Sequence, residues 1–180
     1  MAALWEALAT GETHLLNMSV RDVPRKPDRT TWITYLRCHD DIGLGFDEDH
    51  VRSLGKDPYM HKHFLVNYYT GKFPGSTALG VPFANNPKTG DARISGSNAA
   101  LVGLEYAEQS GNVEAIDTAV HKYLMMHAII LAYGGLPMIY YGDEIGMGND
   151  HSYLDNPDQS YDNRWVHRPI IDWKRVEKRK

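Results

Sequence analysis

The stretch TTWITYLRCHDD, residues 30–41, decides the fold. Its first seven residues are β-branched, aromatic or leucine, a composition typical of a buried strand. Ionisable residues follow at once, from Arg37 to Asp41. Active sites of parallel α/β folds lie at the carboxyl ends of strands, so the end of this strand is the first place to expect function.

A second strand is expected at residues 136–141, LPMIYY, and ends at Gly142-Asp143-Glu144. Before it, apolar residues recur at helical spacing over residues 113–133, and Gly134 and Gly135 end that helix. A helix that leads directly into a strand is the crossover connection of a parallel sheet. We therefore predict an α/β fold with two parallel strands.

The rest of the chain is predicted to be helix and loop. Helices are expected over residues 1–18, where Gly11 weakens but does not break the pattern, over 57–69, over 98–111 with Asn98 as the cap, and from Trp173 onward. Residues 21–29 and 70–97 are predicted loops, and a loop as long as the second is usually functional. A complete eight-stranded barrel needs about 250 residues, so two strands indicate part of a larger fold.

Composition excludes several classes of protein. The formal net charge of −4 argues against a nucleic-acid-binding protein. The chain has no apolar run long enough to span a membrane and no N-terminal signal peptide, so a cytoplasmic location is expected. Cys38 is the only cysteine, which excludes an intrachain disulfide. We interpret it as a small buried residue, because the carboxylates of Asp40 and Asp41 disfavour a reactive thiolate.

Four stretches in order carry a family resemblance. They are YLRCHDDIG (35–43) with FDED (46–49), the segment from GVPF to TGDARISG (80–96), GGLPMIYYGDE (134–144), and DNRW with HRP (162–169). Together they resemble the catalytic (β/α)8 barrel of glycoside hydrolase family 13, the α-amylase family, and within it amylosucrase. The resemblance covers nearly the whole chain.

The resemblance implies a partial TIM barrel, with strands seven and eight, their flanking helices and a long inserted region. Residues 1–18 would be the helix before strand seven, 30–41 strand seven and the catalytic loop, 42–112 the insertion, 113–144 a helix and strand eight, and 145–180 the loop after strand eight. The family's nucleophile Asp and acid/base Glu belong to strands four and five, and neither motif occurs in this chain.

The resemblance also assigns five site residues. Retaining glycosidases use a nucleophile and an acid/base about 5–5.5 Å apart. Asp40 matches a third carboxylate, which binds sugar hydroxyls and stabilises the transition state, and His39 matches the histidine that donates a hydrogen bond to the glucosyl hydroxyls. Arg164 matches an arginine that pairs with an acidic residue to close the glucosyl pocket, and that partner is expected outside this chain. Asp41 and Arg93 match residues on the acceptor side. Ala84 departs from the family, which has a larger polar residue there.

The implied activity of the intact enzyme is transfer of glucose from sucrose to an α-glucan through a covalent glucosyl intermediate. α-Amylase activity, or hydrolysis, isomerisation or phosphorolysis of sucrose, are alternatives within the family. The expected partners are sucrose, α-glucan and the remainder of the barrel. A stand-alone sugar-binding or structural module is the alternative outside it.

Other ionisable residues are given structural roles. Glu144 is interpreted as structural, because adjacent residues of an extended chain point to opposite sides and Asp143 could not work beside it. His61 and His63 are poorly placed for a shared metal, and no zinc-ligand spacing is present. No cofactor and no metal are therefore expected. The isolated chain should be catalytically inert, and it should self-associate through exposed strand edges.

Overall fold

The computed structural model describes residues 1–178 and is 46% helical and 6% strand. This confirms that the chain is helix-rich, with an α/β character. The α-helices are α1 (Ala2–Thr10), α2 (His14–Arg21), α3 (Glu48–Ser53), α4 (Pro58–Tyr69), α5 (Asn98–Leu101), α6 (Leu104–Ser110), α7 (Val113–Ala132) and α8 (Trp173–Glu177). Three 3-10 helices follow the last strand: η1 (Asp143–Ile145), η2 (Ser152–Asp155) and η3 (Asn163–His167).

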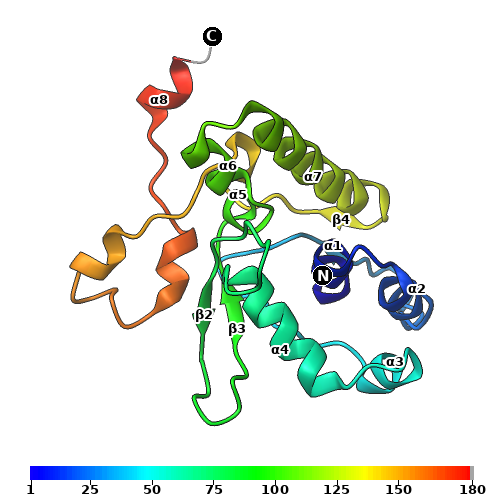
Figure 1. The fold of residues 1–180 in the computed structure, drawn as a ribbon. Helices are drawn as coiled ribbons and strands as arrows, with labels where there is room; N and C mark the ends of the chain where they lie inside the picture. The colour runs from blue at the N-terminus through cyan, green and yellow to red at the C-terminus, as the bar shows by residue number, and fades with distance from the viewer. Residues whose placement is uncertain (179–180) are drawn as a thin grey trace.

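The two predicted strands pair in parallel, as expected. Strand β1 (Ile33–Thr34) lies beside β4 (Leu136–Pro137), and α7 leads into β4 (Figure 1). The ladder extends slightly further, because the Leu136 N–H donates to the Trp32 carbonyl and the Met138 N–H donates to the Thr34 carbonyl, both at 2.8 Å. Both strands are much shorter than predicted. Within residues 1–178 each strand has only the other as a neighbour, so nothing holds the remaining residues extended.

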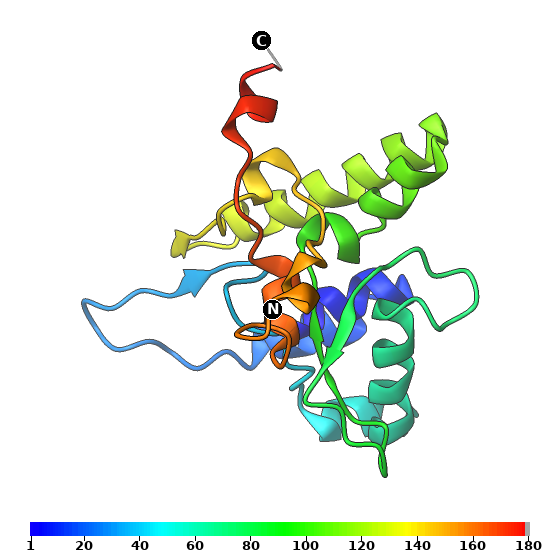
Figure 2. The same ribbon diagram turned by 90° about the vertical axis from the view of Figure 1, so that its left-hand side faces the viewer.

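A second, antiparallel sheet lies inside the segment predicted to be loop. Strand β2 (Val81–Phe83) pairs with β3 (Arg93–Ser95), and the hairpin between them projects from the body of the molecule (Figures 1 and 2). The strands are three residues long and β2 contains Pro82, so the sequence carries no strand signal there. Ile42 forms a bridge with Ile94, which attaches the chain after β1 to this hairpin.

Two predicted helices are interrupted by glycine. Gly11, at φ 72°, ends α1, so residues 1–18 form two helices and not one. Gly103, at φ 88°, divides residues 98–111 into α5 and α6. The cap of α5 is Ser97, whose side chain accepts from the Ala100 N–H, and not Asn98. The breaks at Gly11 and Gly103 both come from glycine in the left-handed conformation, which ends a helix more firmly than its helix propensity suggests.

The other helix predictions are confirmed to within a residue or two. Helix α4 begins after Asp57, whose carboxylate accepts from the Met60 N–H, and Pro58 occupies the first turn. Helix α7 begins after Asn112, whose side chain accepts from the Ala115 N–H. The predicted C-terminal helix from Trp173 is α8; Arg179 and Lys180 of the predicted loop after strand eight lie outside the described residues.

The apolar core lies between α1, α4, α5 and α7. Trp5 is 1% exposed and its indole N–H donates to the Leu36 carbonyl at 3.0 Å, which fixes α1 against the end of β1. Glu6 and His61 form a buried pair at 2.9 Å between α1 and α4. The position of the chain after β1 is therefore set by core packing beneath it.

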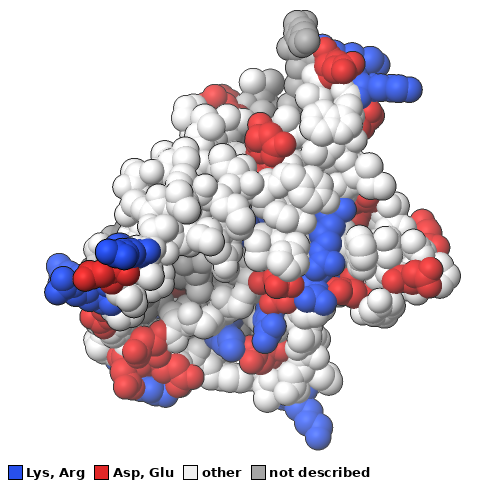
Figure 3. All heavy atoms as spheres, turned by 180° about the vertical axis from the view of Figure 1, so that it is seen from behind, with Lys and Arg blue, Asp and Glu red and all other residues white. Residues whose placement is uncertain are grey.

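The surface is large and unusually apolar around the parallel strands. The accessible area is 10877 Å². A complete globular protein of 20.4 kDa is expected to expose about 8,800 Å². Ile33 and Leu136, the two paired strand residues, are each 61% exposed. Figure 3 shows a broad area without charged side chains, with both signs of charge around it. No described helix combines the length and apolar character needed to cross a bilayer.

Candidate functional site

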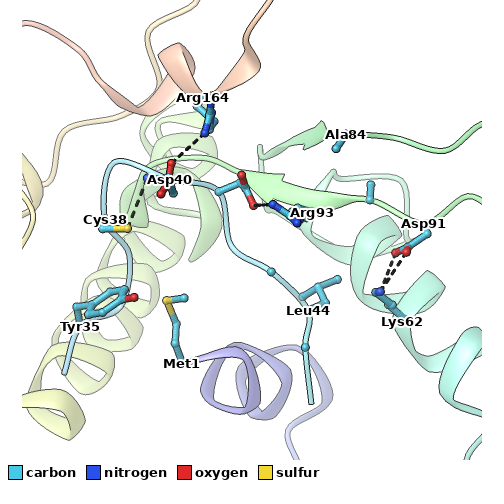
Figure 4. A pocket seen from close by; sticks show the side chains of 14 residues that line it. Met1, Tyr35, Cys38, Asp40, Leu44, Lys62, Ala84, Asp91, Arg93 and Arg164 are labelled. Atoms are coloured by element: carbon cyan, nitrogen blue, oxygen red, sulfur yellow. Dashed lines mark hydrogen bonds and ion pairs between the residues drawn. The ribbon is translucent and has the colours of Figure 1, made fainter. Parts of the chain in front are cut away.

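The chain that leaves β1 carries Asp40 and Asp41 into a hollow of about 760 Å³. Figure 4 shows its lining, which includes Tyr35, Cys38, Asp40, Asp41, Arg93 and Arg164. Four of the five predicted site residues therefore surround one space, although they come from three separate parts of the sequence. Its volume is in the range of small-molecule sites.

Asp40 and Arg164 form the central contact of the hollow. Arg164 Nη1 donates to Asp40 Oδ1 at 2.9 Å, across 124 residues of sequence. The Asp40 side chain is 49% exposed, and its second oxygen, Oδ2, lies 3.4 Å from His39 Nε2. A carboxylate bound at one oxygen can still accept hydrogen bonds from a ligand's hydroxyl groups at the other.

Arg164 is held in place by Asp162. Its Nε and Nη2 donate to the Asp162 carboxylate at 2.8–3.1 Å, and its guanidinium lies 4.7 Å from the centre of the Phe83 ring. Hydrogen bonds from Arg164 lower the pKa of Asp162, and those to Asp162 raise the pKa of Arg164. Within the described residues Arg164 pairs with Asp162 and Asp40, and the further acidic partner expected outside the chain stays a prediction.

Asp41 and Arg93 lie together on the second side of the hollow. Arg93 Nη1 is 3.5 Å from Asp41 Oδ2, and the Asp41 side chain is 5% exposed while that of Arg93 is 60% exposed. The Ile42–Ile94 bridge places the two residues next to each other, with backbone hydrogen bonds of 2.7 and 3.0 Å. Ala84 also lines the hollow, at a positive φ of 50°.

His39 is the exception among the predicted residues. Its side chain is 66% exposed, and it does not line the hollow. Its Nε2 lies 3.4 Å from Asp40 Oδ2, so it stays beside the carboxylate. The structure brings His39 to the edge of the site and not into it.

A buried polar network beneath the hollow was missed from the sequence. Arg37 donates to Asp143 Oδ1 through Nε and Nη2 at 3.0 and 2.8 Å, and Asn98 Nδ2 donates to Asp143 Oδ2 at 2.9 Å. Burial raises the pKa of Asp143, and the Arg37 charge opposes part of that rise. Glu144, given the structural role from sequence, is exposed, and Asp143 holds that role instead.

His167 connects this network to the segment after β1 that carries His39 and Asp40. Its Nδ1 accepts from the Gly96 N–H at 3.0 Å, so the proton is on Nε2, which donates to the His39 carbonyl at 3.1 Å. Arg168 Nε donates to the same carbonyl at 2.8 Å, and Arg37 Nη1 donates to the His167 carbonyl at 3.0 Å. Burial lowers the pKa of His167 to about 4, so the ring is neutral at pH 7.

The charge of Arg37 is the one feature of the sequence that could have predicted this buried polar network. An arginine directly after an apolar strand must find an acidic partner if that strand is buried, and Asp143 is the second residue after the second predicted strand. Parallel pairing of the two strands places the residues that follow them close together. The partnership could therefore have been inferred, whereas the roles of Asn98 and His167 depend on loop geometry.

Cys38 is half-buried, and not fully buried as predicted. Its Sγ accepts a hydrogen bond from the Asp40 N–H at 3.5 Å.

No protein-family model matches the chain.

Proposed function

We propose that this chain forms strands seven and eight of an amylosucrase-like catalytic barrel, with Asp40 as its transition-state-stabilising carboxylate. In this proposal β1 is strand seven, β4 is strand eight, and α7 is the crossover helix between them. The β2–β3 hairpin belongs to the insertion after strand seven. Asp40 and Arg164, joined at 2.9 Å in one hollow, are the observation that carries the proposal.

The arrangement supports sugar chemistry in a specific way. An oxocarbenium-like transition state is stabilised by groups that bind the sugar hydroxyls more strongly as the ring distorts. Arg164 occupies Asp40 Oδ1, so Oδ2, which lies 3.4 Å from His39 Nε2, is the oxygen that would accept from such hydroxyls. Arg164 is fixed by Asp162 and can hold the carboxylate without moving. Asp41 and Arg93 offer polar groups on the acceptor side.

The exposed parallel strands support a partial barrel. A parallel sheet is normally covered on both faces, yet among the described residues β1 and β4 have only each other as neighbouring strands and carry exposed apolar residues. The rest of the proposed barrel would supply the missing strands, and with them a nucleophile and an acid/base. Transfer of glucose from sucrose to α-glucan is the proposed reaction of that complete enzyme.

The test is a chimera in which this chain replaces the corresponding C-terminal portion of an amylosucrase barrel. We expect the chimera to release fructose from sucrose, and D40N to lower the rate at least about 100-fold, as removal of one transition-state contact does elsewhere. H121Q, at an exposed position on α7, is the matched control and should leave the rate unchanged.

A chimera that unfolds cooperatively but releases no fructose would overturn the proposal. The isolated chain supplies a second test, because it lacks a nucleophile and an acid/base in this proposal. Purified chain incubated with sucrose should release no fructose above background, and enzymatic turnover would contradict the assignment.

A further inference from the structure

Three metal-ligating side chains gather at consecutive positions beside the hollow. Cys38 Sγ and one ligand atom each from His39 and Asp40 lie within 4.8 Å of one another. The chain bends at residues 39 and 40, and the three ligand atoms lie close together although the His39 side chain is largely exposed and does not line the hollow. Thiolate, imidazole and carboxylate are all ligands of Zn²⁺ in proteins.

Two of the three ligands already have the required separation. Zn–N and Zn–O bonds of about 2.0–2.2 Å at a tetrahedral angle place the two ligand atoms about 3.4 Å apart. His39 Nε2 and Asp40 Oδ2 are 3.4 Å apart. A Zn–S bond of about 2.3 Å requires Cys38 Sγ at about 3.6 Å from each of them. Cys38 Sγ lies within 4.8 Å of both atoms, so metal binding would require the sulfur to move by up to about 1 Å.

The surroundings leave these ligand atoms available. Arg164 binds Asp40 through Oδ1, which orients Oδ2 toward His39. The Asp40 N–H donates to Cys38 Sγ, which holds the sulfur on the same side of the bend. His39 is 66% exposed and Asp40 49% exposed, so a metal ion can reach the site and a water molecule can take the fourth position.

The charges around the proposed ligands come from arginines and carboxylates together. Arg164 shares its charge between Asp162 and Asp40, and Arg93 is paired with Asp41. Arg168 Nη2 also lies 4.0 Å from Asp40 Oδ1, so both arginines approach Oδ1 and not Oδ2. A thiolate and a carboxylate together carry two negative charges. The sulfur and nitrogen ligands select Zn²⁺ over Mg²⁺ and Ca²⁺, which prefer oxygen.

We infer that Cys38 Sγ, His39 Nε2 and Asp40 Oδ2 form a zinc-binding site at the edge of the hollow. This revises the sequence-based expectation of no metal, which weighed Cys38 as a nucleophile and not as a ligand. Bound Zn²⁺ would occupy Asp40 Oδ2, the oxygen assigned above to sugar hydroxyls. That inhibitory consequence rests on the proposed function, whereas the binding itself does not.

The test is calorimetric titration of ZnCl₂ into the full chain at pH 7.5, in the presence of a non-thiol reductant. We expect one site per chain, and C38S and H39Q should each weaken binding at least about 10-fold. H121Q removes an exposed histidine on α7 and is the control that should leave this site intact. Mg²⁺ and Ca²⁺ should not bind.

Co²⁺ provides a second measurement that identifies the ligand. We expect Co²⁺ to give a thiolate-to-cobalt charge-transfer band that is lost in C38S, with far-ultraviolet circular dichroism unchanged. Zinc affinity that is equal in wild type, C38S and H39Q would overturn the inference, as would the absence of binding or of the thiolate band.

Discussion

The carbonyl of His39 connects the candidate catalytic loop to the rest of the molecule. It accepts from His167 Nε2 and from Arg168 Nε, so two residues near Arg164 hold the chain immediately before Asp40. The His167 ring can make this contact only in one tautomer, because its Nδ1 accepts from Gly96. The position of Asp40 therefore depends on a histidine that stays neutral.

His167 should make stability depend on pH. Its pKa is lowered to about 4 in the folded chain, against about 6.5 when unfolded. Between these values the unfolded chain binds a proton that the folded chain does not, so stability falls as the pH decreases from about 6.5 to about 4. From pH 7.0 to 4.5 we expect wild type to lose about 2–3 kcal/mol more than H167Q. Urea unfolding at the two pH values measures this difference.

A second measurement separates this effect from other titrating groups. Nitrogen NMR of the His167 ring should show an unprotonated Nδ1 and a protonated Nε2 from pH 7 down to pH 5. Equal pH dependence of unfolding in wild type and H167Q, or a ring that titrates near pH 6.5, would contradict the assigned contacts.

The sequence predicted which side chains share the hollow better than it predicted what supports them. Asp40, Asp41, Arg93 and Arg164 were predicted from the family resemblance, and the structure places all four around one hollow. His39 lies outside it, because the bend that presents Asp40 turns the neighbouring side chain toward solvent. Asn98 and His167 were missed, since their roles arise from contacts across 45 and 128 residues of sequence.

Among the secondary-structure elements, long amphipathic helices were predictable and short strands were not. Helices α4 and α7 have apolar periodicity and polar caps at Asp57 and Asn112, which act locally. Strands β1 and β4 are two residues each because ladder formation depends on neighbours that are distant in sequence. The hairpin of β2 and β3 was missed for the same reason.

The turn between α7 and β4 requires glycine at one position in particular. Gly135 has φ +86°, and a Cβ there would lie 2.4 Å from the Trp32 carbonyl oxygen, the acceptor of the first β1–β4 hydrogen bond. Gly134 has φ +96° with nothing within 4 Å of a Cβ. Both alanine variants carry the cost of a positive φ, about 1–2 kcal/mol. Only G135A adds a clash with backbone.

We expect G135A to destabilise the chain by about 1–3 kcal/mol more than G134A. Urea unfolding of the two variants measures the difference directly, and G134A is the matched control. Equal destabilisation would mean that β1 and β4 do not pair in the described register.

The molecule as a whole exposes more surface than its mass requires, and the paired strand residues Ile33 and Leu136 are each 61% exposed. An exposed apolar strand edge is a template for pairing with another chain. We expect the isolated chain to self-associate, with a molar mass by size-exclusion chromatography and light scattering above that of the 20.4 kDa monomer.

Charged side chains placed on the two strands should reverse this self-association. I33K and L136K each place a lysine at a position that is 61% exposed, and we expect both to shift the chain toward monomer. Y161K is the control. It places a lysine at an exposed position that lies away from the strands in sequence and structure, and it should have little effect on self-association. A monodisperse wild-type monomer with a cooperative melt would support a self-sufficient module and contradict a partial barrel.

The central claim is that Asp40 stabilises the transition state of glucosyl transfer once the barrel is complete. The most direct measurement is the ratio of fructose-release rates from sucrose between the barrel chimera and the same chimera carrying D40N. We predict a ratio of at least about 100. A ratio near one, in two proteins that unfold with the same cooperativity, would contradict the claim.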